Sequence, residues 1–438
     1  MKPDAIPHAS GTGYWGFLRR EPFLLSFGLY FAFLSSFGQT FFISLFVPFF
    51  LSDLSLTGAG FGSLYSGATL LSALVLPWVG GWLDRVRLTR FSVGVVGLMA
   101  LSALLLAVSW NLAVFFVALV GIRLSGQGLA SHTALTAMAR YSGRNRGKAL
   151  GLANLGFPLG EATLPLLVTG CIALAGWRET WALVGVSALA LFGPLGVSLL
   201  RRSGVVLDPR AVREKETAGD KTKGQVAWGE TAGTFRRKAL QDFRFWLVLP
   251  AMLLPSFWAT GLFLYQTRIA ELKGWSLTLM ASSFVVFALT RIATALLAGS
   301  TMDRLSARMV FPLSLLPLGM GFVLLMVHDA PWIAYAFMAS LGATMGISAT
   351  LQTALWAELY GIRHLGAIRA MMGSLMVLST AASPVLTGFV LEGGPGPGDR
   401  VGLEGLLWGA MISVAVGTLL ALGILARRRT GPPTEGHP

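Results

Sequence analysis

Two short polar stretches decide how this sequence folds: GGWLDRVRLTR at residues 80–90 and GSTMDRLSAR at residues 299–308. Each follows a long apolar run, and each places a glycine four residues before an Asp-Arg pair. The shared residues are Gly80, Asp84 and Arg85 in the first stretch and Gly299, Asp303 and Arg304 in the second. The members of each pair are 219 residues apart, which indicates that the chain contains two copies of one unit.

The same spacing recurs outside these two stretches. It relates Tyr141, Arg144 and Gly147 to Tyr360, Arg363 and Gly366, and Pro165 to Pro384. Identities at a single offset, spread over separated loops and an apolar run, make duplication the simplest interpretation. Two related halves suit a protein that works by rocking its halves around a central site, and the pseudo-twofold axis that relates them then runs along the membrane normal.

The composition places the chain in a membrane. Hydrophobic residues make up 54% of it and charged residues 12%, against about 25% charged residues in a soluble domain. The mean hydropathy is +0.68. A single cysteine, Cys171, excludes an intramolecular disulfide. The histidines lack metal-ligand spacing and no Gly-Lys-Ser/Thr phosphate loop occurs, so we expect neither a metal nor another cofactor.

Twelve apolar runs are long enough to cross a bilayer as helices. We therefore predict an all-α membrane protein with two six-helix bundles, residues 1–200 and 244–438, joined by a polar linker at residues 201–243. The predicted spans are residues 23–50, 58–80, 91–109, 112–139, 149–172, 179–200, 244–267, 275–298, 309–327, 331–357, 367–390 and 404–426.

The basic residues predict the orientation. Of the 34 lysines and arginines, 28 fall on the side that carries the linker and both termini. The other side receives four basic residues: Arg178, Arg268, Lys273 and Arg400. Cytoplasmic loops are the ones enriched in lysine and arginine, so we expect a multi-pass inner-membrane protein with both termini in the cytoplasm. The formal net charge of +14 then reflects topology, and we expect no nucleic-acid partner.

The paired loops resemble the signature of the major facilitator superfamily, roughly G-x-x-x-D-R-x-G-R-R after the second span and again after the eighth. Gly80, Asp84 and Arg85 match it in the first copy, and Gly299, Asp303, Arg304 and Arg308 match it in the second. The first copy departs at Arg87, Leu88 and Thr89, and the second at Ser306 and Ala307. The resemblance covers essentially the whole chain and implies a secondary transporter that works by alternating access.

The resemblance also implies a cytoplasmic gate. It places Asp84 against the start of span 11 near Gly366, and Asp303 against the start of span 5 near Gly147. A carboxylate at a helix N-terminus meets free N–H groups and the positive end of the helix dipole. Arg85, Arg144, Arg304 and Arg363 complete the predicted gate, with Arg144 and Arg363 as ion-pair partners.

Three ionisable residues lie well inside predicted spans: Arg123 in span 4, Glu161 in span 5 and Arg291 in span 8. Each costs about 2.5–3.5 kcal/mol if it faces lipid, so each must face a cavity or a partner. None is repeated at the 219-residue spacing. Arg123 and Glu161 form either a structural ion pair between spans 4 and 5 or a site where Glu161 accepts a coupled proton.

Arg291 is a candidate substrate-binding residue. The chain is loosely similar to the monocarboxylate and oxalate–formate transporters, in which an arginine on the eighth helix binds carboxylate. Arginine binds carboxylates through two parallel hydrogen bonds. Polar and aromatic residues that we expect beside Arg123 and Arg291 in a substrate cavity are Gln39, Gln127, Trp258, Tyr265 and Gln266.

We therefore predict a monomeric, proton-coupled symporter or antiporter for a small organic anion, with the lipid bilayer, protons and that anion as its partners. Two buried arginines against one glutamate favour an anionic ligand. The alternative is a proton-coupled exporter of hydrophobic drugs or cations. That function calls for a buried acid in span 1 or 7, and neither has one. No constellation of residues in the sequence indicates an enzyme.

Overall fold

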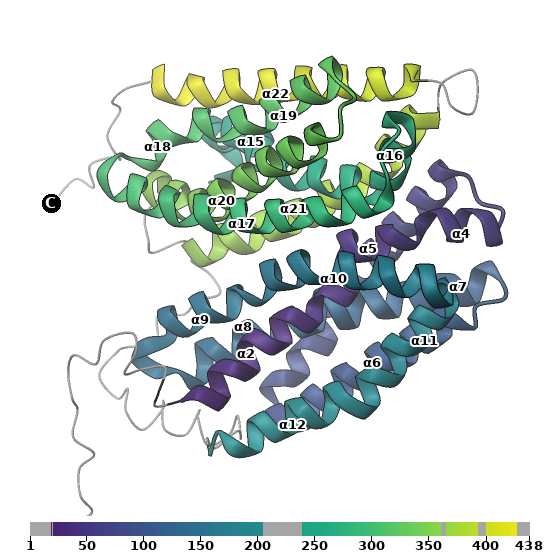
Figure 1. The fold of residues 1–438 in the computed structure, drawn as a ribbon. Coiled ribbons are helices and arrows are strands. Elements are labelled where there is room, and N and C mark those ends of the chain that lie inside the picture. Colours follow the sequence, from purple (N-terminus) through teal and green to yellow (C-terminus); the bar gives the residue numbers. More distant parts are fainter. Residues whose placement is uncertain (1–18, 20, 205–238, 361–364, 393–399, 427–438) are drawn as a thin grey trace, which may run out of the picture.

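The computed structural model describes residues 19, 21–204, 239–360, 365–392 and 400–426, and every regular element within these ranges is a helix. Eleven described helices are long and apolar enough to cross a membrane, and a bent pair, Pro22–Gly38 with Thr40–Asp53, makes a twelfth span. Figure 1 shows the spans gathered in two bundles, one from each half of the chain. The all-α prediction with twelve spans in two six-helix bundles is confirmed.

The N-terminal bundle contains spans 1 to 6, several of them interrupted by 3₁₀ or π turns. Its helices, in chain order, are α2 (Pro22–Leu34), α3 (Thr40–Ile43), α4 (Val47–Asp53), α5 (Gly58–Gly80), α6 (Leu88–Ala107), α7 (Leu112–Ile122), the π-helix η4 (Arg123–Ala130), α8 (Ser131–Tyr141), α9 (Arg146–Asn154), α10 (Gly156–Ala175), α11 (Trp177–Ser187) and α12 (Gly193–Arg202).

The C-terminal bundle repeats this order with longer unbroken helices. They are α15 (Phe243–Leu264), α16 (Gln266–Lys273), α17 (Leu277–Arg304), α18 (Ala307–Val310), α19 (Leu316–Val327), α20 (Trp332–Tyr360), α21 (Leu365–Glu392) and α22 (Val401–Ala426).

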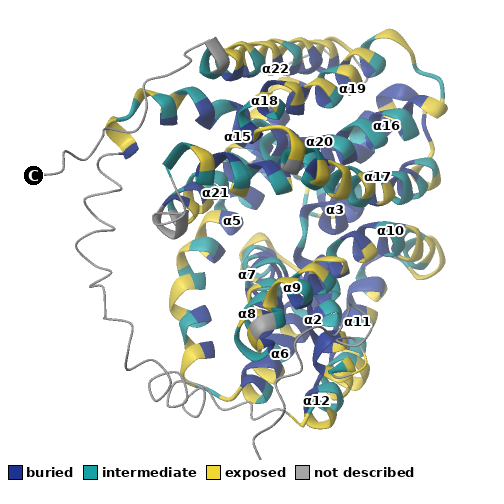
Figure 2. Cartoon of the chain, turned by 90° about the vertical axis from the view of Figure 1, so that its left-hand side faces the viewer, coloured by how far each residue is buried: buried dark blue, intermediate teal, exposed yellow. Residues whose placement is uncertain are grey.

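The helices define two sides of the molecule. We call the linker side the one where the turns at residues 81–87, 142–145 and 305–306 lie, and the far side the one where the turns at residues 54–57, 108–111 and 328–331 lie. Figure 1 shows the linker side on the left and the far side on the right, and Figure 2 views the molecule from the linker side. The most extensive contacts between the halves are those of α5 with α21 and of α10 with α17.

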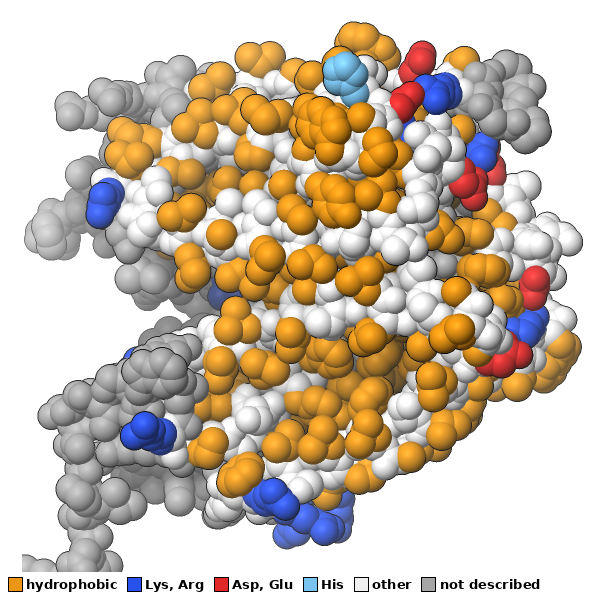
Figure 3. Space-filling view, in the orientation of Figure 1, with side chains coloured by type: hydrophobic (Ala, Val, Ile, Leu, Met, Phe, Trp, Pro, Cys, Tyr) orange, Lys and Arg blue, Asp and Glu red, His pale blue; other side chains and the backbone are white. Residues whose placement is uncertain are grey.

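Apolar side chains cover the outer surface of the spans. Leu174 is 91% exposed and Trp78 is 75% exposed, although both belong to spanning helices. Figure 3 shows hydrophobic side chains across the middle of the molecule and charged side chains toward its two sides. Because lipid solvates apolar groups directly, this surface is what a bilayer requires.

Span 1 bends where it crosses span 4. Gln39 interrupts the helix with an extended backbone (ψ 155°), and the two segments meet at 47°. Gly38 lies so close to η4 that a Cβ there would come within 2.6 Å of the Gln127 backbone nitrogen. Glycine at this position therefore allows two backbones to touch, as small residues commonly do between membrane helices.

Several ion pairs lie on the far side of the molecule, each within one half. Asp329, in the turn between α19 and α20, accepts a hydrogen bond from the Lys273 ammonium at 2.6 Å and also pairs with Arg400. Arg178 pairs with Asp53 across 3.4 Å, and Arg268 with Glu271 across 3.2 Å. All four basic residues that the sequence assigns to this side therefore have acidic partners, and the hydrogen bond from Lys273 lowers the pKa of Asp329.

We predict that Gly38→Ala destabilises the fold. The added methyl group has no space between spans 1 and 4, and overpacking of this kind costs about 1–3 kcal/mol. Unfolding of the purified protein should therefore occur at a lower temperature. Gly97→Ala in α6 is the matched control, because a Cβ there meets nothing within 4 Å. Equal effects of the two substitutions would contradict the close crossing.

We also predict a pH-dependent contribution from Asp329. A carboxyl whose pKa is lowered on folding stabilises the folded state at every pH above its unfolded pKa, which is about 3.9 for aspartate. This stabilisation is lost as the pH falls through the lower, folded-state pKa. Asp329→Asn should therefore unfold at a lower temperature than the wild type at neutral pH, and the difference should shrink on acidification. A difference that stays constant with pH would argue against the ion cluster.

Candidate transport site

An ion pair joins the two halves near the middle of their spans. Arg291 of α17 donates a hydrogen bond from Nη1 to Oε1 of Glu161 of α10. The Glu161 side chain is 10% exposed and that of Arg291 is 24% exposed. The second carboxylate oxygen of Glu161, Oε2, is buried without a hydrogen-bond partner in the described structure. The site therefore holds one carboxylate and one guanidinium, with a free acceptor on the carboxylate.

Glycines hold the helices that carry this pair. Gly160, next to Glu161, packs so closely on span 1 that a Cβ would lie 2.9 Å from the Ser36 Cβ. On the other half, a Cβ on Gly346 of α20 would lie 3.0 Å from the Ala295 nitrogen of α17. Span 5 is thus fixed against span 1, and span 8 against span 10. These contacts position the two charges opposite each other.

The predicted ion pair between Arg123 and Glu161 is wrong. Arg123, which is 3% exposed, donates from Nη1 to the Gly38 carbonyl oxygen at 3.0 Å and to the Tyr65 hydroxyl at 2.6 Å. Its guanidinium also lies over the Tyr65 ring, 4.6 Å from the centroid. The bend in span 1 frees the Gly38 carbonyl, and Arg123 satisfies it. Glu161 is instead paired with Arg291 of the other half.

The three candidate glutamines lie at different places in the fold. Gln39 and Gln127 flank the crossing of spans 1 and 4 and are both partly exposed. Gln266 is buried and donates from Nε2 to the Ser44 hydroxyl at 2.7 Å, so it binds the other half of the protein. Gln39 and Gln127 thus lie beside Arg123, whereas Gln266 lies at the contact between halves.

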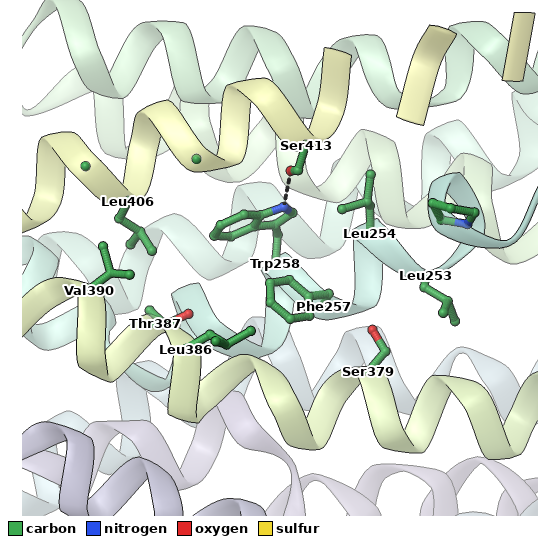
Figure 4. A pocket seen from close by; sticks show the side chains of 13 residues that line it. Leu253, Leu254, Phe257, Trp258, Ser379, Leu386, Thr387, Val390, Leu406 and Ser413 are labelled. Atoms are coloured by element: carbon green, nitrogen blue, oxygen red, sulfur yellow. Dashed lines mark hydrogen bonds between the residues drawn. The ribbon is translucent and has the colours of Figure 1, made fainter. Parts of the chain in front are cut away.

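Trp258 and Tyr265 lie apart although they belong to the same span. The Trp258 indole nitrogen donates to the Ser413 hydroxyl at 2.9 Å, and its ring lines an apolar pocket within the C-terminal half (Figure 4). The Tyr265 hydroxyl lies 2.8 Å from the Gly58 carbonyl oxygen and 2.9 Å from the Pro384 carbonyl oxygen. Tyr265 therefore ties α5 of one half to α21 of the other.

Glu392 completes a closure on the far side that the sequence did not predict. Its carboxylate accepts hydrogen bonds from the Gly58 and Ala59 backbone nitrogens, the latter at 3.0 Å. These free N–H groups begin α5, so an acid at the end of span 11 caps span 2. We call Glu392, Tyr265 and the start of α5 the far-side latch. One sequence signal was available: the position 219 residues before Glu392 is Ala173, so this acid also breaks the repeat.

The linker side lacks such a closure among the residues that the structure describes. Asp84 pairs with Arg140 of its own half. The helices near this side, α8, α9 and α18, pack mainly on elements of their own half. A Cβ added at Gly147, which begins span 5 beside Arg146, would meet nothing within 4 Å. Among the described residues, Gly147 therefore has free space beside it, and Asp84 forms an ion pair within its own half. Its expected contact with the start of span 11 falls on residues outside the described ones and stays a prediction.

The remaining gate predictions are tested only in part. The side chains of Arg85 and Arg304 are exposed. Those of Asp303, Arg144 and Arg363 lie outside the described residues, as does most of the predicted linker. The roles assigned to these residues stay predictions.

Two matches to one family model agree with this architecture. The model described as Major Facilitator Superfamily matches residues 28–290 and again residues 256–438. The chain belongs to the major facilitator superfamily. It is a membrane transporter rather than an enzyme, and secondary transport by alternating access is the activity consistent with its structure.

Solved transporters share the fold of this superfamily member. A bacterial homolog of the human lysosomal transporter Spinster, in an inward-facing and unoccupied conformation, aligns with a TM-score of 0.67 at 17% identity, covering 97% of this chain and 100% of that one. A bacterial homolog of Spinster in an inward-facing and occupied conformation aligns with a TM-score of 0.66 at 14% identity, covering 96% of this chain and 98% of that one. At these identities the likeness concerns the fold alone. None of the curated proteins compared with the sequence matches it.

We predict that Glu392→Gln opens the far-side latch. The amide keeps the shape of the side chain but loses the charge that caps α5, and charge-assisted hydrogen bonds contribute about 1.5–3 kcal/mol. Spin labels at Ser55→Cys and Leu277→Cys, in a Cys171→Ala background, report the far-side separation of the halves. Double electron–electron resonance should show a larger population with a long distance between the two spin labels in Glu392→Gln than in the wild type.

Glu404→Gln is the matched control, since Glu404 is an exposed acid at the far-side end of α22. Tyr265→Phe should move the distance distribution in the same direction as Glu392→Gln. An unchanged distribution in both latch variants would show that these contacts do not hold the far side closed.

Proposed function

We propose that this chain is a proton-coupled transporter of a small organic anion, a carboxylate, across the inner membrane. The observation that supports it is the ion pair between Glu161 and Arg291, because this pair lies at mid-depth and its two members belong to different halves. The Arg291 guanidinium already binds one carboxylate, that of Glu161, so it has the chemistry to bind the carboxylate of a substrate.

Charge balance explains how a proton and an anion would be coupled. With the site empty, Glu161 and Arg291 neutralise each other. An anion that takes over Arg291 leaves the Glu161 carboxylate unpaired in a medium where an unpaired charge is costly. Protonation of Glu161 removes that cost. One proton therefore loads together with one carboxylate, and both move in the same direction.

Arg123 adds a second positive charge to this region. Its described contacts are a backbone carbonyl and a tyrosine, neither of which is a carboxylate. The core of the spans thus holds two guanidiniums against the single carboxylate of Glu161, which favours an anionic ligand over a cation. Gln39 and Gln127, which flank Arg123 and are partly exposed, are suited to orient the polar remainder of the substrate.

The two sides of the molecule support alternating access with the far side closed. The far-side latch, the contact of Gln266 with Ser44 and the ring contact of Phe41 with Phe284 (5.8 Å) all lie away from the linker. Taking the basic loops as cytoplasmic, this arrangement is inward-facing. The gate residues Asp84, Arg85, Arg144, Asp303, Arg304 and Arg363 would engage when the transporter turns outward, and we expect it to act as a monomer.

We predict that Glu161→Gln keeps the exchange of substrate across the membrane but loses its coupling to protons. The amide cannot neutralise Arg291, so counterflow of a labelled carboxylate in proteoliposomes should persist, while accumulation driven by a pH gradient should be lost. Arg291→Gln should weaken substrate binding by on the order of ten- to a hundredfold, because a hydrogen bond to a charged group contributes about 1.5–3 kcal/mol.

Arg291→Lys, which keeps the charge, is the control for Arg291→Gln and should retain part of the binding. Gradient-driven accumulation by Glu161→Gln at the wild-type level would exclude the coupling role. A substrate panel of monocarboxylates, dicarboxylates, inorganic anions and cationic dyes tests the substrate class. Counterflow of the dyes alone would favour the alternative, an exporter of hydrophobic drugs or cations.

A further inference from the structure

A separate apolar pocket lies within the C-terminal half, between α15, α21 and α22. It holds about 430 Å³ and is walled by Phe257 and Trp258 on one side and Leu406 on another (Figure 4). Neither Glu161 nor Arg291 contributes to it. The pocket is therefore distinct from the site at the interface between the halves.

Missing side chains on α22 create the space. Gly405 and Gly409 are four residues apart and therefore share one helix face, which forms a wall of the pocket. A Cβ added at Gly409 would meet nothing within 4 Å, and one at Gly405 only Val390, at 3.9 Å. By contrast, a Cβ added at Gly417 on the same helix would lie 2.7 Å from Leu254 Cδ1. α22 is therefore closely packed at Gly417 and leaves a void at Gly405 and Gly409.

The exposed lining residues mark the mouth of the pocket, and they are Leu386 and Val390 of α21 and Gly405 and Gly409 of α22. Leu386 and Val390 line it and are 54% and 39% exposed. Pro384 and Gly388, which contact the other half, each lie two residues before one of them and so occupy a different helix face. The mouth thus points away from the contact with α5. Leu386 and Val390 also belong to the spanning part of α21, so the mouth lies at the depth of the bilayer hydrocarbon.

The walls of the pocket carry few polar groups that could hydrogen-bond to water. The Ser413 hydroxyl is already hydrogen-bonded, to Trp258 and to the Ala410 carbonyl oxygen. The Thr387 hydroxyl has no hydrogen-bond partner in the described structure but is buried out of reach of water, Ser379 is the remaining polar lining residue, and the exposed lining is otherwise apolar. A buried water needs two to four polar partners, and apolar cavities of this kind stay dry. Empty space of this size forfeits dispersion contacts along all its walls. The hydrocarbon chains of the surrounding lipid lie at the mouth of the pocket and can fill this space.

We propose that this pocket binds an alkyl chain of a bilayer lipid. The lining residues of α21 run from Ser379 to Val390, which corresponds to about 16 Å along the helix at 1.5 Å per residue. That direction follows the spans and hence the chains of the surrounding lipid. The driving force is dispersion contact with the walls, because moving an alkyl chain from lipid into an apolar pocket gains nothing from the hydrophobic effect.

A chain in this pocket would brace the far-side latch. Two of the three walls are α15, which ends just before Tyr265, and α21, which ends at Glu392. The occupant therefore supports the two C-terminal helices that close the far side. The binding itself does not depend on the identity of the transported substrate, so it can fail or succeed independently of the function proposed above.

Quenching of Trp258 tests the proposal. The protein is reconstituted in vesicles of phosphatidylcholine brominated in mid-chain, and the emission of Trp258 is obtained by subtracting that of Trp258→Phe. We expect bromine to quench Trp258 although its side chain is buried, and aqueous iodide not to quench it. Gly409→Leu, which fills the void, should reduce the quenching by brominated lipid.

Gly94→Leu is the matched control, because Gly94 of α6 is an exposed helical glycine with nothing within 4 Å and lies in the other half. It should leave the quenching of Trp258 unchanged. Quenching by iodide would show a water-filled cavity, and an absence of bromine quenching would show an empty one. Equal quenching in Gly409→Leu and the wild type would place the alkyl chain elsewhere. Each of these three results overturns the proposal.

Discussion

The rest of the structure depends on one ion pair, between Glu161 of the N-terminal half and Arg291 of the C-terminal half. Each of these charges costs about 2.5–3.5 kcal/mol in hydrocarbon if it has no partner. Neither half can therefore present its own charge to lipid, and both must meet at the interface. The ion pair thus holds the two bundles in register at mid-depth.

The ends of the molecule respond to this constraint in opposite ways. On the far side, a carboxylate from one half caps a helix of the other, through Glu392 and the start of α5. On the linker side, the equivalent chemistry stays within one half, where Asp84 pairs with Arg140. The far-side closure consists of a few hydrogen bonds, so opening it would change few contacts. Small differences of this kind let a ligand shift a protein between two conformations.

The sequence predicts the spans, the duplication and the presence of charges at mid-depth, because these follow from hydropathy and spacing along the chain. It does not predict which charges pair. Successive residues of a helix point in directions about 100° apart, and the sequence does not give the rotation of each helix about its axis. One of the two alternatives that the sequence left open paired Arg123 with Glu161, whereas Glu161 pairs with Arg291 in the structure. Glu392 was missed because it lies at the end of a span and resembles a solvated loop charge.

The fate of Arg123 shows how the fold compensates a charge without an acid. The bend at Gln39 leaves the carbonyl of Gly38 outside a regular helix, and the guanidinium takes it as an acceptor while lying over the Tyr65 ring. Broken helices line the binding sites of many transporters because their free backbone groups serve as ligands. Here the freed group is negative and faces a cation. A carbonyl and a tyrosine neutralise less charge than a carboxylate does, so Arg123 keeps a positive potential at mid-depth. In the function proposed above, an anion drawn toward this potential would meet Arg291 within the spans, where Glu161 is the group that it would replace.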